Sequence, residues 1–379
     1  MRDVAIAGAG YSEIARAVDR SVGSLTLEAC RNALSDAGLT SKDVDGIATY
    51  PGGHDSVSSF YVAEGLGLPK LNWFEDLFGW MPAGITPVIA AAEAVRAGHC
   101  ETAIAFRTVK RNRTRPPGQG FGGRVGGDAQ FRAPFGDVMT SQWLAMWARR
   151  HMHDFGTTEE HLGHIAITFR EHASMNPVAP LRDNITIDDY FASKIITTPF
   201  RILDCDFPVD GGGAVVITTE ERARDLPKSP VKYVAGVFAS GPRPDWEQWD
   251  DLTHMASKYA AEALWRRTDI TPQDVDVAEV YDGFSWTALC WMEDMGFCAK
   301  GDGGPFFARG DARVGGKLPT NTHGGSMSGG RLHAISHVIE CVQQLRGECG
   351  ARQVHGAKTG VVTAGGGIMA GAALLSRSE

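Results

Sequence analysis

Short apolar runs alternate along this chain with longer amphipathic or alanine-rich stretches, which is the pattern of an α/β protein. Glycine clusters separate many of these segments and mark the ends of the apolar runs. The apolar runs predict strands at Val4–Ala7, Gly46–Thr49, Thr102–Phe106, Ala214–Thr218, Tyr233–Val237, Ala278–Tyr281, Gly360–Thr363 and Ala372–Leu375. The longer stretches predict helices that include Leu25–Ala37, Val88–Ala97, His254–Arg266 and Ile335–Arg346.

The chain contains an internal repeat. Segment 36–50 reappears as segment 267–281, in which Asp43, Asp45 and Tyr50 recur as Asp274, Asp276 and Tyr281 at a constant offset of 231 residues. Both halves also close with a glycine-rich turn that leads into an apolar strand. Two similar βα halves, residues 1–228 and 229–379, are therefore expected. Residues 107–199 have no counterpart in the second half, and we expect them to form a mixed loop and helical insertion.

Composition narrows the class of protein. The 379 residues are 43% hydrophobic and 22% charged, which fits a globular chain and excludes disorder. The net charge of −8 makes a dedicated nucleic-acid or anionic-membrane binder a poor expectation. No segment approaches the ~18 consecutive apolar residues of a membrane span, and the first apolar run is too short for a signal peptide. The seven scattered cysteines form no Cys-x-x-Cys pair, so we expect a reducing, cytoplasmic setting.

Three motifs of the second half carry a family resemblance. They are Tyr281-Asp-Gly-Phe284, Asn321-Thr-His-Gly-Gly325 and Gln344-Leu-Arg-Gly347. In this order, and with the duplicated halves, they resemble the thiolase superfamily, in particular its sterol-carrier and lipid-transfer-protein branch. The resemblance spans essentially the whole chain. It implies the thiolase fold, a five-layered αβαβα sandwich with two stacked sheets around a central helical layer.

The chain departs from thiolases at the residues that perform their chemistry. Met81 stands where the family has its nucleophilic cysteine, Thr363 where it has its second cysteine, and Arg331 where it has the histidine of a Gly-His-Pro motif. A thioether forms no acyl-enzyme, and neither a threonine hydroxyl nor an arginine replaces a thiolate or a neutral imidazole near pH 7. Claisen chemistry by the usual route is therefore not expected.

The replaced residues resemble a smaller subgroup, the cysteine-less aldolases that cleave steroid side chains. Its Tyr-Asp-x-Phe signature is matched by Tyr281-Asp-Gly-Phe284. This resemblance implies retro-aldol cleavage of a bulky β-hydroxyacyl-CoA to a ketone and a shorter acyl-CoA. Such a reaction needs a base for the hydroxyl proton and donors for the enolate oxygen. It implies no cofactor beyond the coenzyme A of the substrate.

Candidate catalytic residues follow from these motifs. Tyr281 ends a predicted strand and could relay the hydroxyl proton if Asp282 adjusts its acidity; otherwise it is a half-buried tyrosine like Tyr50, and Asp282 is a cap or turn residue. His323 precedes two glycines, so its ring and the backbone N–H groups near Gly325 could face one ligand oxygen. A loop histidine without catalytic function is the alternative.

A second group lies before the last long helix. His333 and His337 are four residues apart, but no third ligand is evident, so we expect no metal. We expect His333 to face the site near a helix N-terminus whose dipole lowers its pKa, with His337 packing. Arg331 stands where the subgroup has a second tyrosine, and it either binds an anionic group of the substrate or leaves the pocket.

Two stretches of the first half are candidates for substrate binding. Five cations occur in nine residues, Arg107, Lys110, Arg111, Arg113 and Arg115, and Lys110 and Arg111 could clamp the phosphates of coenzyme A, although a solvated loop is as good an interpretation. Trp80 and Met81 belong to an aromatic stretch that could line an apolar acyl pocket, or could be core or interface.

The resemblance also implies partners. It implies a homodimer, which we expect to form through a free edge at Thr102–Phe106, and a small OB-fold and zinc-ribbon partner giving an α2β2 complex, with the basic stretch near the docking site. Two alternatives to the aldolase remain. One is a non-catalytic thiolase-like subunit that binds acyl-CoA or lipid, and the other is an acyltransferase that uses Cys290 or Cys298.

Overall fold

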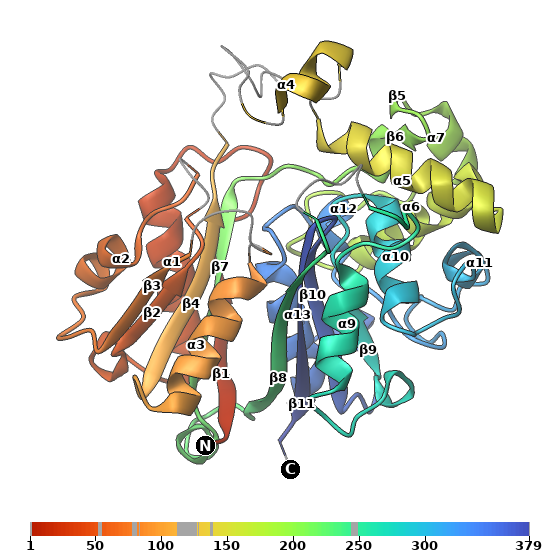
Figure 1. Cartoon of the computed structure of the whole chain (residues 1–379). Coiled ribbons are helices and arrows are strands. Elements are labelled where there is room, and N and C mark those ends of the chain that lie inside the picture. The colour runs from red at the N-terminus through yellow and green to blue at the C-terminus, as the bar shows by residue number, and fades with distance from the viewer. Residues whose placement is uncertain are drawn as a thin grey trace.

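The structure is a computed structural model of the whole chain. It describes residues 2–51, 55–77, 82, 84–111, 127, 129–136, 139–243 and 249–378. The chain has an α/β architecture in which a central sheet is covered by helices, with a largely helical insertion beyond one end of the sheet (Figure 1).

Nine strands form one sheet in the order β3-β2-β4-β7-β1-β8-β11-β10-β9. The first half contributes β1 (Val4–Tyr11), β2 (Gly46–Thr49), β3 (Trp73–Asp76), β4 (Thr102–Val109) and β7 (Gly211–Thr219). The second half contributes β8 (Val231–Ser240), β9 (Val277–Glu279), β10 (Thr359–Gly366) and β11 (Met369–Arg377). Within the sheet, the two halves are joined by a short pairing of β1 with β8, at Ala5 with Lys232 and Ile6 with Val231. The two stacked sheets that the sequence predicted are therefore two parts of one sheet, splayed apart at this joint.

Helices cover both parts of the sheet and fill the space between them (Figure 1). Helix α1 (Val22–Ala37) packs on the outer face of the first half, and α9 (Ser257–Trp265) and α10 (Ser285–Asp294) belong to the core on the outer face of the second. Helices α3 (Ile85–Ala97) and α13 (Ile335–Arg346) share the core between the two parts. This arrangement confirms the predicted five-layered αβαβα sandwich.

Side-chain alternation along the strands explains these layers. In β1 the side chains of Val4 and Ile6 join the central core, while those of Ala5 and Ala7 face α1. Successive residues of a strand point to opposite faces, so a strand buried on both faces is apolar throughout. The continuous apolar runs of the sequence are therefore central strands.

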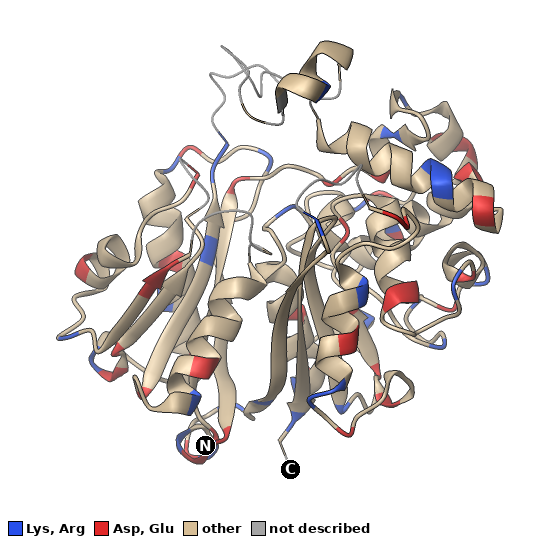
Figure 2. Cartoon of the chain, in the orientation of Figure 1, with Lys and Arg blue, Asp and Glu red and all other residues tan. Residues whose placement is uncertain are grey.

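The remaining described elements are short or belong to the insertion. These elements are α2 (Ser59–Leu66), α4 (Ala129–Arg132), α5 (Thr140–Phe155), α6 (Glu159–Ser174), α7 (Ile187–Ala192), β5 (Ile195–Thr197), β6 (Phe200–Arg201), α8 (Glu220–Arg224), α11 (Gly303–Ala308) and α12 (Gly325–Ser328). Helices α5, α6 and α7 lie beyond the end of the second half, and α6 contacts α10, α11 and α12 (Figure 1). Charged residues of both signs are spread over helices and loops, and the inner strands carry few (Figure 2).

Two predictions about edges and loops are wrong. The segment Thr102–Phe106 is no free edge, because β4 lies between β2 and β7 and is hydrogen-bonded to both. The strand at that end of the sheet is β3, which the sequence pattern did not reveal. Arg107 is a buried residue of β4 and not part of a solvated loop.

No helix among the described residues is long and apolar enough to cross a membrane.

Candidate active site

The motif residues meet at one end of the sheet, where strands of both halves end. Tyr50 follows β2 and Tyr281 follows β9, so the repeated tyrosines occupy corresponding positions in the two halves. Arg107 lies near the end of β4, and Thr363 lies in β10 beside β9. Groups separated widely in sequence are therefore brought to one place by the strand order.

The backbone around Tyr281 is fixed by neighbouring side chains. The Tyr281 N–H donates to Oγ1 of Thr363 at 2.9 Å. The Asn321 amide pairs with the backbone of Val280, accepting from its N–H at 2.7 Å and donating to its carbonyl at 2.8 Å. A Cβ at Gly283 would lie only 3.0 Å from the Tyr281 ring. Thr363, in the place of the second thiolase cysteine, thus positions the tyrosine backbone.

The phenol of Tyr281 stays protonated at neutral pH. Burial raises its pKa well above the ordinary value, and Asp206 raises it further, while Arg331 counteracts part of this effect. A phenol with a raised pKa is a hydrogen-bond donor and a poor base. The structure therefore favours donation by Tyr281 over the removal of a substrate proton.

Asp282 is fully buried, and its carboxylate accepts three hydrogen bonds. Its carboxylate accepts from the backbone N–H of Ser326 at 2.7 Å, from that of Met327 at 3.0 Å and from Nε2 of His337 at 3.0 Å. A Cβ at Gly325 would approach Oδ2 of Asp282 to 2.0 Å. Asp282 thus caps the first turn of α12, which is the alternative that the sequence left open, and Gly325 provides the space for it.

His323 and His337 form a buried pair. Their ring centroids lie 4.6 Å apart, and Nδ1 of His323 lies 2.9 Å from Oε2 of Glu279. Burial lowers the pKa of His323, but the carboxylates of Glu279, Glu340 and Asp282 together raise it above the ordinary value. Nε2 of His323 is buried and has no hydrogen-bond partner in the described part of the chain. Among the described residues His323 therefore has one ring nitrogen without a partner, whereas His337 is engaged by Asp282.

Arg107 joins the two halves at the site. Its guanidinium pairs with the Asp55 carboxylate at 3.0 and 2.8 Å and donates to the Tyr50 carbonyl at 2.9 Å. Its Nε and Nη2 also lie 3.2 and 3.0 Å from Nδ1 of His333. Because a guanidinium only donates, Nδ1 of His333 must accept and is unprotonated. His333 is therefore a neutral imidazole.

His333 lies just before helix α13, near its N-terminus as expected. Helix α13 begins at Ile335, and His333 and Ala334 adopt left-handed φ angles of 52° and 68°. His333 and His337 consequently do not share a helix face. Burial lowers the pKa of His333 well below 6.5, and Arg107 and then Arg331 lower it further. The low pKa was predicted, but its causes are burial and two arginines rather than a helix dipole.

Arg331 points to a carboxylate that the sequence did not single out. Its Nη1 lies 3.6 Å from Oδ2 of Asp206, and this carboxylate raises the pKa of Arg331 above its usual value. The two side chains are partly exposed, to 37% for Arg331 and 17% for Asp206. Asp206 and Asp55 belong to no recognisable motif, and Arg107 was noticed only as part of a basic stretch, so only the fold could bring them into the site.

The residues expected to bind coenzyme A are placed in part. Nζ of Lys110 donates to the Val18 carbonyl at 2.5 Å and lies 3.8 Å from Asp210, and the Arg111 N–H donates to Asp210 at 3.0 Å. Lys110 is thus already engaged within the chain. Trp80, Met81, Arg113 and Arg115 lie outside the described residues.

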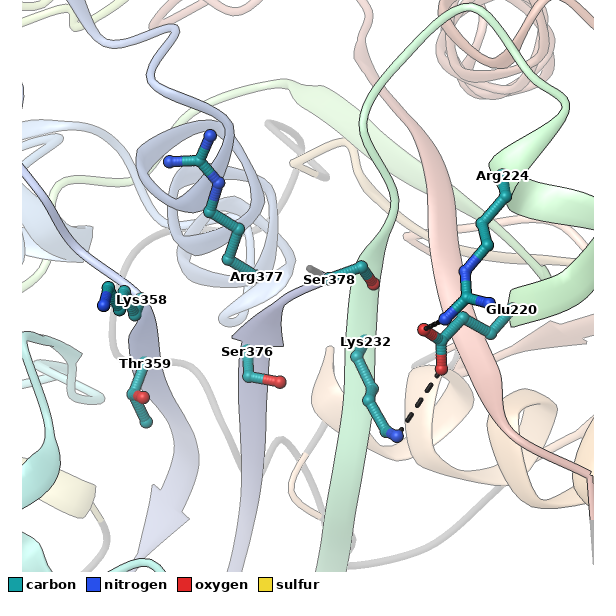
Figure 3. A pocket seen from close by; sticks show the side chains of 8 residues that line it. All are labelled: Glu220, Arg224, Lys232, Lys358, Thr359, Ser376, Arg377 and Ser378. Carbon is teal, nitrogen blue, oxygen red and sulfur yellow. Dashed lines mark hydrogen bonds and ion pairs between the residues drawn. The ribbon is translucent and has the colours of Figure 1, made fainter.

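Two hollows lined by described residues are large enough to be relevant to ligand binding. A hollow of about 650 Å³ is lined by Phe207, the residue that follows Asp206 in the chain, together with segments 12–16 and 177–181. Figure 3 shows a second hollow, of about 570 Å³, at the other end of β10. It is lined by Glu220, Arg224, Lys232, Lys358, Thr359, Ser376, Arg377 and Ser378. Glu220 pairs there with Arg224 at 2.8 Å and with Lys232 at 3.5 Å. These ion pairs neutralise part of the positive charge of the hollow.

The two cysteines considered as nucleophiles are unsuited to that role. Burial raises the pKa of Cys290 well above its usual value and that of Cys298 to about 12. Cys290 lies on α10, where its thiol contacts Asp294 at 3.3 Å. Protonated thiols are weak nucleophiles. Within the described residues, moreover, no three His, Cys, Asp or Glu side chains are grouped so as to hold a metal ion.

Comparison with known proteins agrees with this fold. Residues 242–376 match the family model "Thiolase C-terminal domain-like". A "Steroid side-chain-cleaving aldolase" of Thermomonospora curvata is 34% identical over 96% of this chain and 95% of that protein. The chain belongs to the thiolase superfamily. Within this superfamily it resembles the cysteine-less aldolases, as the Tyr-Asp-x-Phe motif indicated.

Two further proteins of the superfamily support this placement. A "17-hydroxy-3-oxo-4-pregnene-20-carboxyl-CoA lyase" of Mycobacterium tuberculosis is 35% identical over 96% of both chains. A solved structure described as an "Ltp2-ChsH2(DUF35) aldolase" superposes with a TM-score of 0.91 at 33% identity, and it covers 99% of this chain and 98% of that one. The resemblance therefore extends over both halves and the insertion.

Proposed function

We propose that this protein is a carbon–carbon lyase that cleaves a bulky β-hydroxyacyl-CoA, of the steroid side-chain type, by a retro-aldol reaction. Relatives that match almost the whole chain bear aldolase and lyase names. The observation that carries the proposal is the setting of Tyr281, whose backbone is held after β9 by Asn321 and by Thr363, the residue that stands where a thiolase has its second cysteine. Cleavage without an acyl-enzyme fits this replacement.

The site provides groups that can stabilise the negative charge that develops during cleavage. Tyr281 keeps its proton and can donate to an oxygen that becomes negative as the carbon–carbon bond breaks. Nε2 of His323 is a second buried group without a partner among the residues described. Arg107 and Arg331 add positive charge, which stabilises an enolate in a site of low polarity. The thioester oxygen is the atom on which that charge accumulates.

The test is an incubation of the purified chain, with and without its partner, with a tertiary β-hydroxyacyl-CoA. We expect equimolar ketone and shorter acyl-CoA, measured by mass spectrometry. Only hydrolysis to the free hydroxy acid, or no reaction across several side-chain lengths, would contradict the proposed activity.

A small partner protein also belongs to this proposal. One solved relative is an aldolase complex whose description names a DUF35 component. The insertion of this chain exposes large apolar side chains, including Phe131 at 70% and Phe135 at 87%, which a partner would cover. We expect an OB-fold partner to dock there and to contribute to binding of coenzyme A or the acyl group, giving an α2β2 complex with the homodimer.

A binding subunit without catalysis is the second candidate. The loss of both thiolase cysteines and the cap formed by Asp282 are compatible with a scaffold. A scaffold would bind acyl-CoA, but its binding and its partner's turnover would not depend on the Tyr281 hydroxyl.

A further inference from the structure

Asp206 lies between the segment that carries Tyr281 and the segment that carries Arg331. Its N–H donates to the carbonyl of Gly283 at 3.1 Å, next to Tyr281 and Asp282. On the other side, the N–H of Arg331 donates to the carbonyl of Phe207 at 2.9 Å. Isolated bridges join Cys205 to Phe284 and Pro208 to Arg331 along the same segment. Backbone contacts on both sides therefore fix the position of Asp206.

The carboxylates of Asp206 and Asp282 differ in what they are free to do. Asp282 is fully buried and accepts hydrogen bonds from two backbone N–H groups and His337. Asp206 has Arg331 at 3.6 Å, longer than a direct hydrogen bond, and its side chain is 17% exposed. Of the two, Asp206 is the one that a substrate hydroxyl can reach.

We propose that the Asp206 carboxylate is the base that removes the hydroxyl proton of the substrate; this inference rests on the proposed retro-aldol function. The proton passes to Asp206, the carbon–oxygen bond becomes a ketone carbonyl, and the carbon–carbon bond breaks. Its electron pair forms the thioester enolate, to which Tyr281 donates a hydrogen bond. The enolate carbon then takes the proton from the Asp206 carboxyl group. The products are the ketone and the shorter acyl-CoA, and the carboxylate is restored.

The neighbouring groups suit this assignment. Tyr281 is a poor base because its pKa is raised, and Arg331 cannot exchange protons. Nδ1 of His333 is occupied by Arg107. Burial raises the pKa of Asp206; Arg331 counteracts this in part, Asp282 adds to it and Arg111 lowers it. A carboxylate with a raised pKa is a stronger base.

The test compares Asp206→Asn with the wild type under conditions in which the wild type releases ketone. We expect kcat to fall by about 100-fold or more, with KM within about threefold, because a proton acceptor is lost and no contact area. Asp225→Asn, which removes an exposed carboxylate at the end of α8, is the matched control and should retain wild-type kcat. Wild-type kcat in Asp206→Asn, or a rise in KM alone, would overturn the inference while leaving the proposed function intact.

The pH profile of kcat provides a second readout that does not depend on the stability of Asp206→Asn. The wild type should lose activity at low pH with an apparent pKa above that of an ordinary aspartate. In Arg331→Gln this acid limb should move to higher pH, because the cation that lowers the pKa of Asp206 is removed. An unmoved limb would overturn the assignment. If the wild type released no ketone at all, the proposed function would fail first, and the base with it.

Discussion

At Tyr281 the hydroxyl group distinguishes a catalytic residue from one that only packs. Tyr281→Phe removes the donor but keeps the ring over Gly283. If the phenol donates to the enolate oxygen, kcat should fall by roughly 100-fold or more, with acyl-CoA affinity unchanged. Steady-state kinetics and calorimetric titration with a product acyl-CoA measure the two quantities.

Tyr61→Phe on α2 is the control for this variant, because Tyr61 is exposed and lies outside the site. It should retain wild-type kcat. Full activity in Tyr281→Phe would instead favour a tyrosine that serves packing alone.

Position 325 requires glycine for two reasons, its left-handed backbone conformation and the closeness of Asp282. It has a φ of 60°, and a Cβ would lie 2.0 Å from Oδ2 of Asp282. Gly325→Ala should lower the free energy of unfolding by about 3 kcal/mol or more, since the left-handed conformation alone costs ~1–2 kcal/mol and the clash adds to it. It should also lower kcat, because the loop that carries His323 shifts. Urea unfolding measures the first effect.

Gly347 supplies the matched control. It caps α13 with a φ of 78°, but nothing lies within 4 Å of a Cβ there. Gly347→Ala should therefore cost only the ~1–2 kcal/mol of backbone strain. Equal losses in the two variants would show that the approach to Asp282 is unimportant.

Sequence motifs revealed some of the site residues and missed others for a physical reason. Tyr281 and His323 stand in motifs, so their presence at the site could be anticipated. The hydrogen bonds that make Asp282 a cap depend on the backbone of α12, which has no sequence pattern of its own. Asp206 and Arg107 are ordinary charged residues until the strand order places them beside Arg331 and His333.

At the scale of elements, His172 ties α6 to the loop that carries the site. Its Nε2 accepts from the N–H of Val314 at 3.2 Å, so Nδ1 carries the proton and donates to the Asn321 carbonyl at 3.2 Å. Burial lowers the pKa of His172 to about 4, below the ordinary 6.5. The folded state thus disfavours protonation of this ring.

The stability of the protein should therefore fall as the pH is lowered from 6.5 towards 4. The unfolded chain takes up the proton first, which lowers the free energy of unfolding by on the order of 3 kcal/mol at the end of this window. Urea unfolding at several pH values should show a shallower fall in His172→Gln than in the wild type. Identical slopes would rule out His172 as a source of this pH dependence.

The predicted bounds of an element were accurate where its apolar pattern was uninterrupted. Helix α13 and strand β2 have the predicted bounds, because apolar residues at helical or strand spacing are buried there. Strand β3 was missed, since Trp73–Asp76 lies at the edge and none of its residues is fully buried. The irregular segment 331–334 before α13 was also missed, because positive φ angles at His333 and Ala334 are set by packing against Gly84.

At the scale of the whole molecule, the sequence repeat indicated the two halves, but it did not show how they join. Tyr50 and Tyr281 occupy matching positions after β2 and β9. The pairing of β1 with β8 involves only two residue pairs, and no sequence pattern marks it. The central core between the halves depends on α3 and α13 together, so neither half buries its inner face without the other.

Of the two edge strands of the described nine-stranded sheet, β9 is buried, which leaves β3 for association with a second copy of the chain. Strand β3 begins the strand order and pairs with β2. On this strand Phe74 is 49% exposed, and its ring lies tilted against that of Phe60 with the ring centroids 4.6 Å apart. An open edge with exposed aromatic side chains favours pairing with another strand. We expect the dimer to form through β3, in place of the edge at Thr102–Phe106 that the sequence suggested.

Light scattering of the isolated chain at micromolar concentration should then report about twice its mass of 40.7 kDa. Phe74→Lys should shift the protein to monomer, because each β3 edge would bring an additional positive charge to the interface and lose apolar contact area. Phe191→Lys, on α7 of the insertion, replaces a comparably exposed phenylalanine and should leave the dimer intact. A dimer that persists in Phe74→Lys would place the interface elsewhere, and a wild-type monomer would show that β3 is covered within a single chain.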